Sequence, residues 1–540
     1  MQDNHGESRI GAEFAARVEA NQKALTSGLR TSYDFIVCGS GSSGAVVARR
    51  LAENADVSVL LLEAGGTDDL PQIHDAARWL EIRNTAQDWA FKTRPNPHLN
   101  GRSMPWAMGK VLGGSSSINA MAWARGHKND WDDYARQTGD DGWSYPSVLA
   151  IYRAIEDWHG APDPERRGSG GLLAIYPQAP SALFAALVDS APEFGMPTFA
   201  DHNGRMMETD GGVAPAEMRI SGGKRLSVYR SYTYPYMDRP NLTVLTDALV
   251  TRVIVEDGKA VGVEVIHKGA PRRFEAAHEV ILSLGAIHTP KVLMQSGIGD
   301  AEELRRFGIK VLHHLPGVGR NLQDHILINA CAWESPSPIE PGLKLFGGLF
   351  VRKSDTTLVT PDLQCLIAAH VALGPATGHL DNALPYWSIR PGLVRPRSVG
   401  RIHLTGPAPD DPVDIDANIL ADPADVEAAM RGVQFSREIG NSAAFRPFSK
   451  REVLPGPCGR SELEQFVRDA AVSFHHYAGT AKMGRDDMSV VDGALKVYGI
   501  DRLRVADGSV MPSVTTGNTM GPCIVIGERA AAMIRKSHGL

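Results

Sequence analysis

The chain has little cysteine, and its cysteines do not pair in any recognisable motif. Cys38, Cys331, Cys365, Cys458 and Cys523 are far apart, and none lies in a Cys-x-x-Cys motif that would hold a metal or a redox disulfide. The N-terminal segment lacks the apolar core of a secretory signal, and no apolar run is long enough to cross a bilayer. We therefore expect a cytoplasmic protein without disulfides, a membrane span or a metal site.

An excess of charge of one sign is also missing. The formal net charge is -6, and 22% charged with 43% hydrophobic residues is ordinary for a globular protein. This balance gives no electrostatic reason to expect nucleic acid or an anionic membrane as a partner. Because 540 residues exceed one typical compact core, we expect a two-lobed protein, and the sequence does not indicate its oligomeric state.

A strand, a glycine turn and a helix follow one another near the N-terminus. Residues 33–38 have strand character, Gly39-Ser-Gly41-Ser-Ser-Gly44 follows directly, and residues 45–51 have helical periodicity. In a dinucleotide fold Gly39 allows the tight turn, Gly41 lets the pyrophosphate approach the backbone, and Gly44 lets helix and strand pack closely. The helix N-terminus then favours an anion, so the segment predicts a nucleotide site.

An acidic residue follows the glycine turn at the spacing that a ribose contact requires. The apolar run 57–62 ends on Glu63, about 20 residues beyond the glycines. A carboxylate there binds the adenosine ribose and disfavours the 2'-phosphate of NADP. The motif alone does not distinguish FAD from NAD.

Five later runs are too distinctive for ordinary loops: residues 109–126, 285–299, 396–404, 476–484 and 506–530. The first begins Gly-Lys-Val-Leu-Gly-Gly-Ser-Ser-Ser-Ile-Asn and the second Gly-Ala-Ile-His-Thr-Pro, and they resemble the two signatures of the glucose-methanol-choline (GMC) family of flavin oxidoreductases. All five occur in the order of that family. The resemblance therefore extends from Tyr33 almost to the C-terminus.

The resemblance implies FAD as cofactor and an α/β fold. We expect a Rossmann-like FAD-binding domain with an inserted α+β substrate domain that carries an antiparallel sheet. The implied bounds are an N-terminal extension at 1–30, a discontinuous FAD-binding domain at 31–155, 235–318 and 465–540, and a substrate domain at 156–234 and 319–464. Strand character within the substrate domain occurs at 368–373, 387–390 and 400–404.

The glycine turn and the resemblance together predict the residues that contact FAD. The small residues of the second loop offer N–H and hydroxyl donors without bulk. By resemblance, Val250 at the end of a strand expected over 242–250 meets the adenine, and Asp507 lies near the pyrophosphate. Some relatives attach FAD through a histidine where this chain has Ile118, so we expect a non-covalent flavin. The full predicted set is Gly39, Gly41, Ser43, Gly44, Glu63, Val111, Gly114, Ser115, Asn119, Met121, Val250, Asp507, Asn518 and Thr519.

Oxidation of an alcohol requires a base beside the flavin, and histidine suits this role because its ordinary pKa is about 6.5. The resemblance assigns the base to His476, one of 18 histidines, and the orienting partner to Asn518, whose amide is neutral at every working pH. The adjacent His475 leaves a one-residue alternative open. If this segment is a strand, the two side chains point to opposite faces and only one meets the substrate.

The predicted reaction is the oxidation of a primary alcohol to an aldehyde, with oxygen or another molecule as the final electron acceptor. Tyr386, Trp387 and Phe474 are candidate pocket walls, although core packing is the plainer interpretation of each. Aromatic walls favour an aryl, heteroaryl or furanic alcohol. The alternatives are a lyase of the same fold acting on cyanohydrins, a choline or aliphatic alcohol dehydrogenase, a nicotinamide dehydrogenase that shares only the first glycine turn, and an FAD-binding protein without turnover.

Overall fold

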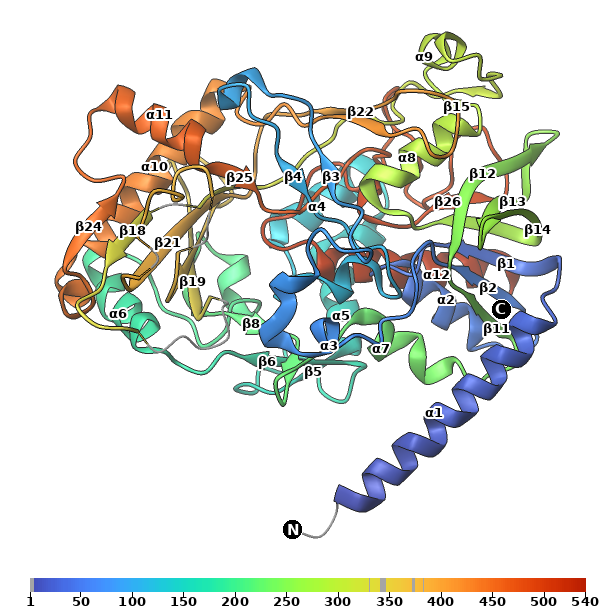
Figure 1. Ribbon diagram of the computed structural model, residues 1–540, viewed down its shortest axis with the longest axis horizontal. Coiled ribbons are helices and arrows are strands. Elements are labelled where there is room, and N and C mark those ends of the chain that lie inside the picture. The colour runs from blue at the N-terminus through green and yellow to red at the C-terminus, as the bar shows by residue number, and fades with distance from the viewer. Residues whose placement is uncertain (1–3, 330, 340–345, 372–373, 382) are drawn as a thin grey trace.

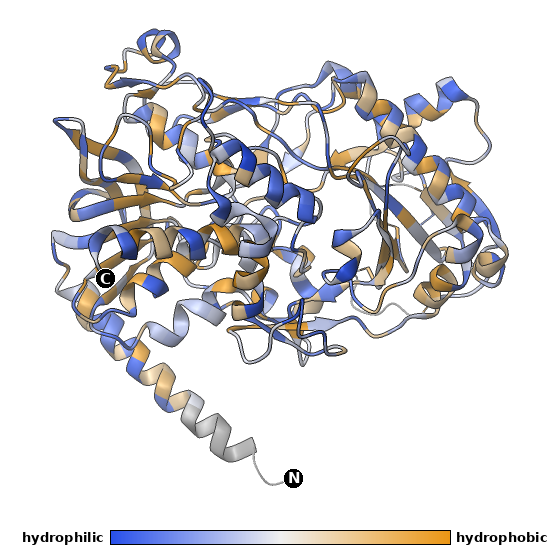
Figure 2. Cartoon of the chain, turned by 180° about the vertical axis from the view of Figure 1, so that it is seen from behind, coloured by the Kyte–Doolittle hydropathy of each residue, from blue (hydrophilic) through white to orange (hydrophobic). Residues whose placement is uncertain are grey.

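Two large β-sheets lie at opposite ends of the molecule, joined by helices and long loops (Figure 1). The computed structural model describes residues 4–329, 331–339, 346–371, 374–381 and 383–540. Helix α1 (Asn4–Ser27) extends away from the body beside the first sheet. Hydrophobic residues concentrate along the strands of both sheets, and hydrophilic residues are frequent on the outer helices (Figure 2). The strands of both sheets contribute buried residues to one continuous hydrophobic core.

The first sheet has the strand order β11-β2-β1-β14-β13-β12, and β26 pairs with the end of β14. Its five parallel strands are β1 (Ser32–Cys38), β2 (Val59–Leu62), β11 (Leu242–Leu245), β14 (Ala270–Leu282) and β26 (Leu503–Val505). An antiparallel hairpin of β12 (Ala248–Glu256) and β13 (Lys259–His267) extends it. This topology is the predicted Rossmann-like sheet.

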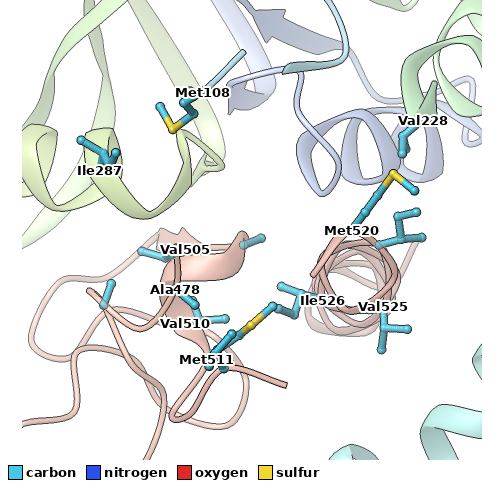
Figure 3. Close-up of a cluster of buried hydrophobic side chains, with 14 of the residues drawn as sticks. Met108, Val228, Ile287, Ala478, Val505, Val510, Met511, Met520, Val525 and Ile526 are labelled. Atoms are coloured by element: carbon cyan, nitrogen blue, oxygen red, sulfur yellow. The ribbon is translucent and has the colours of Figure 1, made fainter. Parts of the chain in front are cut away.

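Continuous apolar strands explain why this sheet is buried on both faces. The last four residues of β1 and all of β2 have no exposed surface, which is typical of parallel strands between helices. Helices α2 (Gly44–Ala52) and α12 (Met520–His538) pack together beside the sheet. Figure 3 shows Met520 and Ile526 of α12 close to the side chains of Val228 and Met511. The C-terminal helix thus ties the last part of the chain to the first.

The second sheet has eight strands. Six of them follow the order β24-β18-β21-β20-β19-β7, and β17 pairs with both β21 and the eighth strand, β25. All its pairs are antiparallel, as predicted for the substrate domain. Helix α10 (Pro423–Gly440) contacts β18, β20 and β21. The strands are β7 (Gly212–Pro215), β17 (Ile326–Ile328), β18 (Cys331–Glu334), β19 (Gly348–Arg352), β20 (Leu363–Ala368), β21 (Tyr386–Leu393), β24 (Arg451–Leu454) and β25 (Ala471–Ser473).

Three strand predictions need correction. The single strand expected over 242–250 is two strands, because the chain turns at Asp247, whose φ is 53°. Strand β20 ends at Ala368, where the predicted strand 368–373 was to begin, and residues 372–373 lie outside the described residues. Strand β22 (Arg401–Leu404) pairs with β23 (Val413–Asp416) in a hairpin outside the large sheet. The strand predicted at 387–390 is confirmed within β21.

The N-terminal extension is helical and is attached through its second half. Phe14 packs edge-on against Tyr234 at 5.7 Å between ring centroids, and Val18 is buried. The Gln22 amide donates hydrogen bonds to the carbonyls of Met237 and Leu242. The domain bounds remain a prediction, and β25, which lies within 465–540, pairs with the second sheet rather than the first.

Candidate active site

The glycine turn is sterically tight at two glycines and open at the third. A Cβ at Gly39 would lie 2.3 Å from the Ser283 carbonyl oxygen, and one at Gly44 would lie 1.9 Å from the Gly39 carbonyl oxygen. A Cβ at Gly41 would meet no atom within 4 Å. The turn therefore packs closely on the sheet and leaves space at Gly41, which fits a diphosphate lying against the backbone.

The second glycine loop packs directly on this turn. Gly114 has a φ of 52°, and a Cβ there would lie 2.8 Å from the Gly41 Cα. The Gly113 N–H donates a hydrogen bond of 3.1 Å to Ser40 Oγ. Val111 is fully buried beside Ile118 in an apolar cluster. Two segments about 70 residues apart thus form one small-residue surface at the edge of the first sheet.

Glu63 lies at the end of β2, where the sequence predicted a ribose contact. Ser40 donates to Glu63 Oε2 from its backbone N–H (3.1 Å) and its hydroxyl (2.6 Å), and the Gly65 N–H donates to Oε1 (2.9 Å). Burial raises the pKa of Glu63 above its ordinary value, while these hydrogen bonds act in the opposite direction. The carboxylate therefore shapes the glycine turn, and its remaining lone pair is compatible with a ribose hydroxyl.

Asp507 connects the end of β26 to helix α8 (Gly285–Gln295). Its carboxylate accepts hydrogen bonds from the Gly285 N–H (2.9 Å), the Thr289 hydroxyl (2.6 Å) and the Ser509 N–H (2.8 Å). Ser43 donates 2.7 Å to the Cys523 carbonyl in the first turn of α12. The Asp507 contacts hold the start of α8 against the end of β26, and the Ser43 contact holds the start of α12 against the glycine turn. Thr519 is the N-cap of α12.

Asn119 lies within the first signature and organises its loop. Arg225 donates to its backbone carbonyl (2.7 Å) and its side-chain oxygen (2.9 Å), and the Met121 N–H also donates to that oxygen (2.9 Å). Met121 adopts a φ of 58°, which a side chain other than glycine rarely does. Arg225 is buried with one guanidinium nitrogen unpaired and without a carboxylate partner, which fits a neighbouring anion.

Val250 and Ser115 are the remaining predicted cofactor contacts. Val250 is buried near the start of β12, at the edge of the first sheet beyond β13 in strand order. Ser115 Oγ accepts a hydrogen bond of 3.2 Å from the Gly109 N–H. The open space at Gly41, the unpaired Arg225 nitrogen and the donor-rich second loop together fit a flavin dinucleotide.

His476 lies in the loop after β25 and faces Asn518. The Asn518 amide nitrogen donates to His476 Nε2 at 3.0 Å, and the His476 backbone N–H donates to Asp324 Oδ1 at 2.8 Å. Burial alone lowers the pKa of His476 to about 3, so its imidazole is neutral at physiological pH. Nε2 of the neutral imidazole therefore carries a lone pair that can accept a proton, and this lone pair faces the Asn518 amide.

His325 is a neighbour of His476 that the sequence analysis missed. Its Nδ1 lies 2.9 Å from His476 Nδ1, across 151 positions of sequence. Because His476 Nε2 accepts from Asn518, the proton of His476 lies on Nδ1 and is donated to His325. His325 is fully buried. Burial, together with the repulsion that would arise if both neighbouring imidazoles were protonated, holds the pKa of His325 well below the ordinary value. One histidine among 18 carries no local signal that would have identified it.

Asp324, immediately before His325, was also missed. Its carboxylate accepts hydrogen bonds from the Ser473 hydroxyl and the His476 N–H. Burial nevertheless raises the pKa of Asp324 to about 7. The carboxylate fixes the backbone of the His476 loop rather than its imidazole.

The tandem histidines differ in partners. His475 Nδ1 lies 2.7 Å from the Tyr477 hydroxyl, and the Tyr477 ring stacks on Trp106 at 3.9 Å. Burial, with the nearby Arg83 charge, lowers the pKa of His475 to about 3. The expectation that these residues lie on a strand is wrong, because His475 has a φ of 62° in a loop. This backbone conformation, rather than strand alternation, directs the two rings to different partners.

The three candidate pocket walls separate into different environments. The Phe474 ring lies 4.7 Å from the His476 ring and keeps some accessible surface. Trp387 is stacked between Trp333 (4.5 Å) and Phe445 (4.9 Å) and has no exposed surface, so it belongs to the core. Tyr386 is half-buried at the start of β21. Of the three, only Phe474 contacts the imidazole of His476.

The fold and this site define a flavin-dependent oxidoreductase, and comparison with known proteins identifies its family. Residues 33–327 and 396–527 match the N- and C-terminal parts of the family described as GMC oxidoreductase. The chain is 36% identical to an oxygen-dependent choline dehydrogenase of Stenotrophomonas maltophilia and 37% identical to an alcohol dehydrogenase [acceptor] of Pseudomonas putida, each over 93% of this chain and 95% of the relative. It is also similar to the crystal structure of pyridoxine 4-oxidase from Mesorbium loti, with a TM-score of 0.89 and 30% identity over 94% of this chain and 99% of that one.

The chain belongs to the GMC oxidoreductase family and is an FAD-dependent enzyme that acts on CH–OH donors. The predicted family, fold class and cofactor are thereby confirmed. In the part of the chain that the structure describes, no helix combines the length and apolar character needed to span a membrane.

Proposed function

We propose that the protein oxidises a primary alcohol, preferably aryl, heteroaryl or furanic, to the aldehyde, with His476 as the base and Asn518 as the orienting partner. The observation that carries this proposal is the contact of 3.0 Å between the Asn518 amide and Nε2 of a buried, neutral imidazole. The bound FAD supplies the hydride acceptor, which oxygen or another oxidant regenerates.

The chain's own residues handle the hydroxyl proton. The hydroxyl oxygen would lie between His476 Nε2 and the Asn518 amide, and the proton would move to Nε2 while the amide donates to the developing alkoxide. The resulting imidazolium keeps its Nδ1–H on the uncharged His325 Nδ1. His476 is only 8% exposed, so bulk water does not compete for the proton.

The aromatic preference rests on the apolar surroundings of His476. Phe474 lies against the imidazole, and a cluster next to it contains Leu349, Leu366 and the partly buried Phe346. Choline is the second candidate, favoured by the names of several relatives. A quaternary ammonium is usually held by an acid or an aromatic cage. Gly392, which lies beside Phe474, has Leu327 opposite it on one neighbouring strand and Gln364 on the other. Both side chains are uncharged, so neither supplies the acid that would hold a quaternary ammonium.

The cofactor contacts and the domain bounds given above are part of this proposal. So is a non-covalent flavin, because Ile118 has no nucleophile and lies in an apolar cluster with Ile73 and Ile82. A cytoplasmic location remains a prediction from the cysteine pattern.

Anaerobic titration of the FAD-loaded protein with benzyl alcohol, 5-hydroxymethylfurfural and choline tests the proposal. We expect the aromatic alcohols to bleach the visible absorption of the flavin. His476→Ala should abolish bleaching with FAD still bound, and the neighbouring His475→Ala is the matched control that should retain it. Failure of every alcohol to reduce the flavin would favour a lyase or a binding protein, and equal loss in both variants would contradict the assignment of His476. Admission of oxygen then distinguishes an oxidase, which releases peroxide, from a dehydrogenase.

A further inference from the structure

Asp130, in the first turn of helix α4 (Lys128–Thr138), is a fully buried acid with more partners than its helix requires. Its Oδ2 accepts a hydrogen bond of 2.8 Å from the His127 N–H, which is the ordinary contact of a helix capping box. The same oxygen accepts from the Thr516 N–H at 2.7 Å, and Oδ1 accepts from the Thr516 hydroxyl at 3.1 Å and from Arg395. Capping therefore accounts for only one of these four hydrogen bonds.

Arg395 completes the arrangement around Thr516. It follows β21 by two residues and donates to the Thr516 hydroxyl at 3.4 Å as well as to Asp130. A buried carboxylate is costly without a cation, so this ion pair offsets the burial of Asp130. The Arg395 side chain itself is 28% exposed in a surface cleft of about 500 Å³. Asp130, Arg395 and Thr516 thus form a closed set of contacts, which we call the Thr516 clamp.

The Thr516 clamp lies two residues before Asn518. Gly517, between them, has a φ of 103°, and a Cβ there would lie 3.1 Å from the Ala124 Cβ. A side chain would be strained in this conformation and crowded against Ala124, so the glycine lets the chain turn sharply toward the base. The Asn518 amide then donates to His476 Nε2 at 3.0 Å. The residue that orients the substrate is therefore separated from the clamp by a single glycine.

The clamp also joins the two segments that carry the side chains proposed for catalysis. His476 follows β25, and β25 is attached through β17 to β21. Arg395 follows β21, so it extends from the same sheet as the base. Asn518 instead precedes helix α12, which packs beside the first sheet. The contacts among Arg395, Asp130 and Thr516 therefore fix the Asn518 segment against the sheet from which His476 extends.

We propose that Asp130, paired with Arg395, is a positioning residue, which holds Thr516 so that the Asn518 amide is aimed at the substrate oxygen beside His476 Nε2. This inference rests on the alcohol oxidation proposed above and adds Asp130 to the machinery of the same site. A displacement of about 1 Å at a reaction centre costs roughly 100-fold in rate, so Asp130→Ala should slow flavin reduction about tenfold to hundredfold. Substrate affinity should change less, because the amide acts mainly on the alkoxide that forms during the reaction.

Nitrogen NMR of the FAD-loaded protein with isotopically labelled histidine tests the geometry without any reaction. A hydrogen bond to an unprotonated imidazole nitrogen shifts its resonance, and the His476 Nε2 signal is identified by its loss in His476→Gln. We expect Asn518→Ala and Asp130→Ala to move this signal in the same direction and by a similar amount. Glu279→Ala is the matched control, since it removes another buried acid paired with an arginine, Arg504, and should leave the signal in place.

Stopped-flow reduction at saturating benzyl alcohol tests whether Asp130 acts through Asn518. If it does, Asp130→Ala should slow the wild-type reaction but have little further effect in the Asn518→Ala background, whereas a general packing defect would slow both backgrounds equally. Thr516→Val keeps the shape of the side chain but loses the hydroxyl that contacts Asp130 and Arg395. It should therefore reduce the flavin up to roughly tenfold more slowly, as for a lost hydrogen bond to a charged group, and Thr516→Ser should recover the rate.

The inference is overturned if Asp130→Ala leaves the His476 signal in place, if its effect on the rate is additive with that of Asn518→Ala, or if Thr516→Val reacts at the wild-type rate. The Thr516 variants retain both members of the ion pair, so their rates and NMR signals decide the matter if Asp130→Ala does not fold. If no alcohol reduces the wild-type flavin while the signal moves in the clamp variants, the oxidation proposal fails and the positioning role stands.

Discussion

His325 permits a test of how the base works, because it contacts His476 through Nδ1 and not through the nitrogen that faces Asn518. His325→Ala removes the only described hydrogen-bond partner of His476 Nδ1. His325→Asn is informative because an asparagine side-chain oxygen occupies about the position of a histidine Nδ1. His325→Gln is the matched control, since its oxygen lies about where Nε2 was.

The magnitude follows from the charge that forms on His476 during the reaction. A hydrogen bond between neutral groups contributes about 0.5–1.5 kcal/mol, and one to a charged group about 1.5–3 kcal/mol. The contact at 2.9 Å is of the first kind before proton transfer and of the second kind afterwards. Its loss should therefore cost about 1–2 kcal/mol of differential stabilisation, which slows flavin reduction roughly fivefold to thirtyfold.

Anaerobic stopped-flow reduction by an aromatic alcohol at pH 7, where the His476 imidazole is neutral, measures this rate. We expect His325→Ala and His325→Gln to reduce the flavin slowly, and His325→Asn to recover much of the rate. FAD content and Tm, measured beside each rate, separate this effect from a packing defect. Equal rates for the alanine and asparagine variants, or a wild-type rate in His325→Ala, would refute the reasoning.

Three further predictions follow from burial and steric contacts. Burial lowers the pKa of His202 to about 4 and the pKa values of His288, His475 and His476 to about 3. Below about pH 6.5, the ordinary pKa of histidine in an unfolded chain, the unfolded protein therefore binds more protons than the folded one. The free energy of unfolding consequently falls as the pH falls. Each histidine contributes up to roughly 1.4 kcal/mol per pH unit. Asp324, with its raised pKa of about 7, opposes one of them, and the raised pKa values of Glu63 and Asp507 act in the same direction as that of Asp324. Urea unfolding should therefore show a net loss of stability between pH 6.5 and 5, and a flat profile would contradict this. Gly44→Ala should lower the Tm of the apoprotein because its Cβ would meet the Gly39 carbonyl at 1.9 Å, whereas Gly41→Ala should keep the apoprotein Tm and lose FAD, and the reverse ranking would argue against the glycine roles. Acid precipitation should release all flavin into the supernatant, and flavin retained in the pellet would exclude the non-covalent attachment expected from Ile118.

Local steric demands made the nucleotide-binding end of the fold predictable. A strand, three glycines and a helix must be consecutive for the turn to form, so the sequence contains the whole unit between Ser32 and Ala52. The break at Asp247 was not predictable in the same way. Asp247 adopts a left-handed conformation without being glycine, and the strand patterns on either side continue through it.

Contacts between distant segments account for what the sequence did not reveal in the site. Asn518 lies 42 residues beyond His476 and was assigned through the family resemblance. His325 and Asp324 reach the same loop from β17, which pairs with β25 only once the second sheet has formed. The residue pattern around His325 does not indicate His476 as its partner. The contact depends on the pairing of β17 with β25, two short strands more than 140 residues apart.

The contrast between Trp387 and Arg390 shows the limit of strand patterns most clearly. Both lie on β21, three positions apart, so they point to opposite faces of the sheet. The sequence favoured the aromatic residue as a pocket wall, yet Trp387 is stacked in the α10-side core, and the charged residue lies on the face beside His476. The identity of the two faces is decided by Gly432 and Gly440, which let α10 approach Pro391 and Trp333 more than 30 residues away. A one-residue change of register would exchange the two faces, so the chemical character of the pocket depends on where α10 packs.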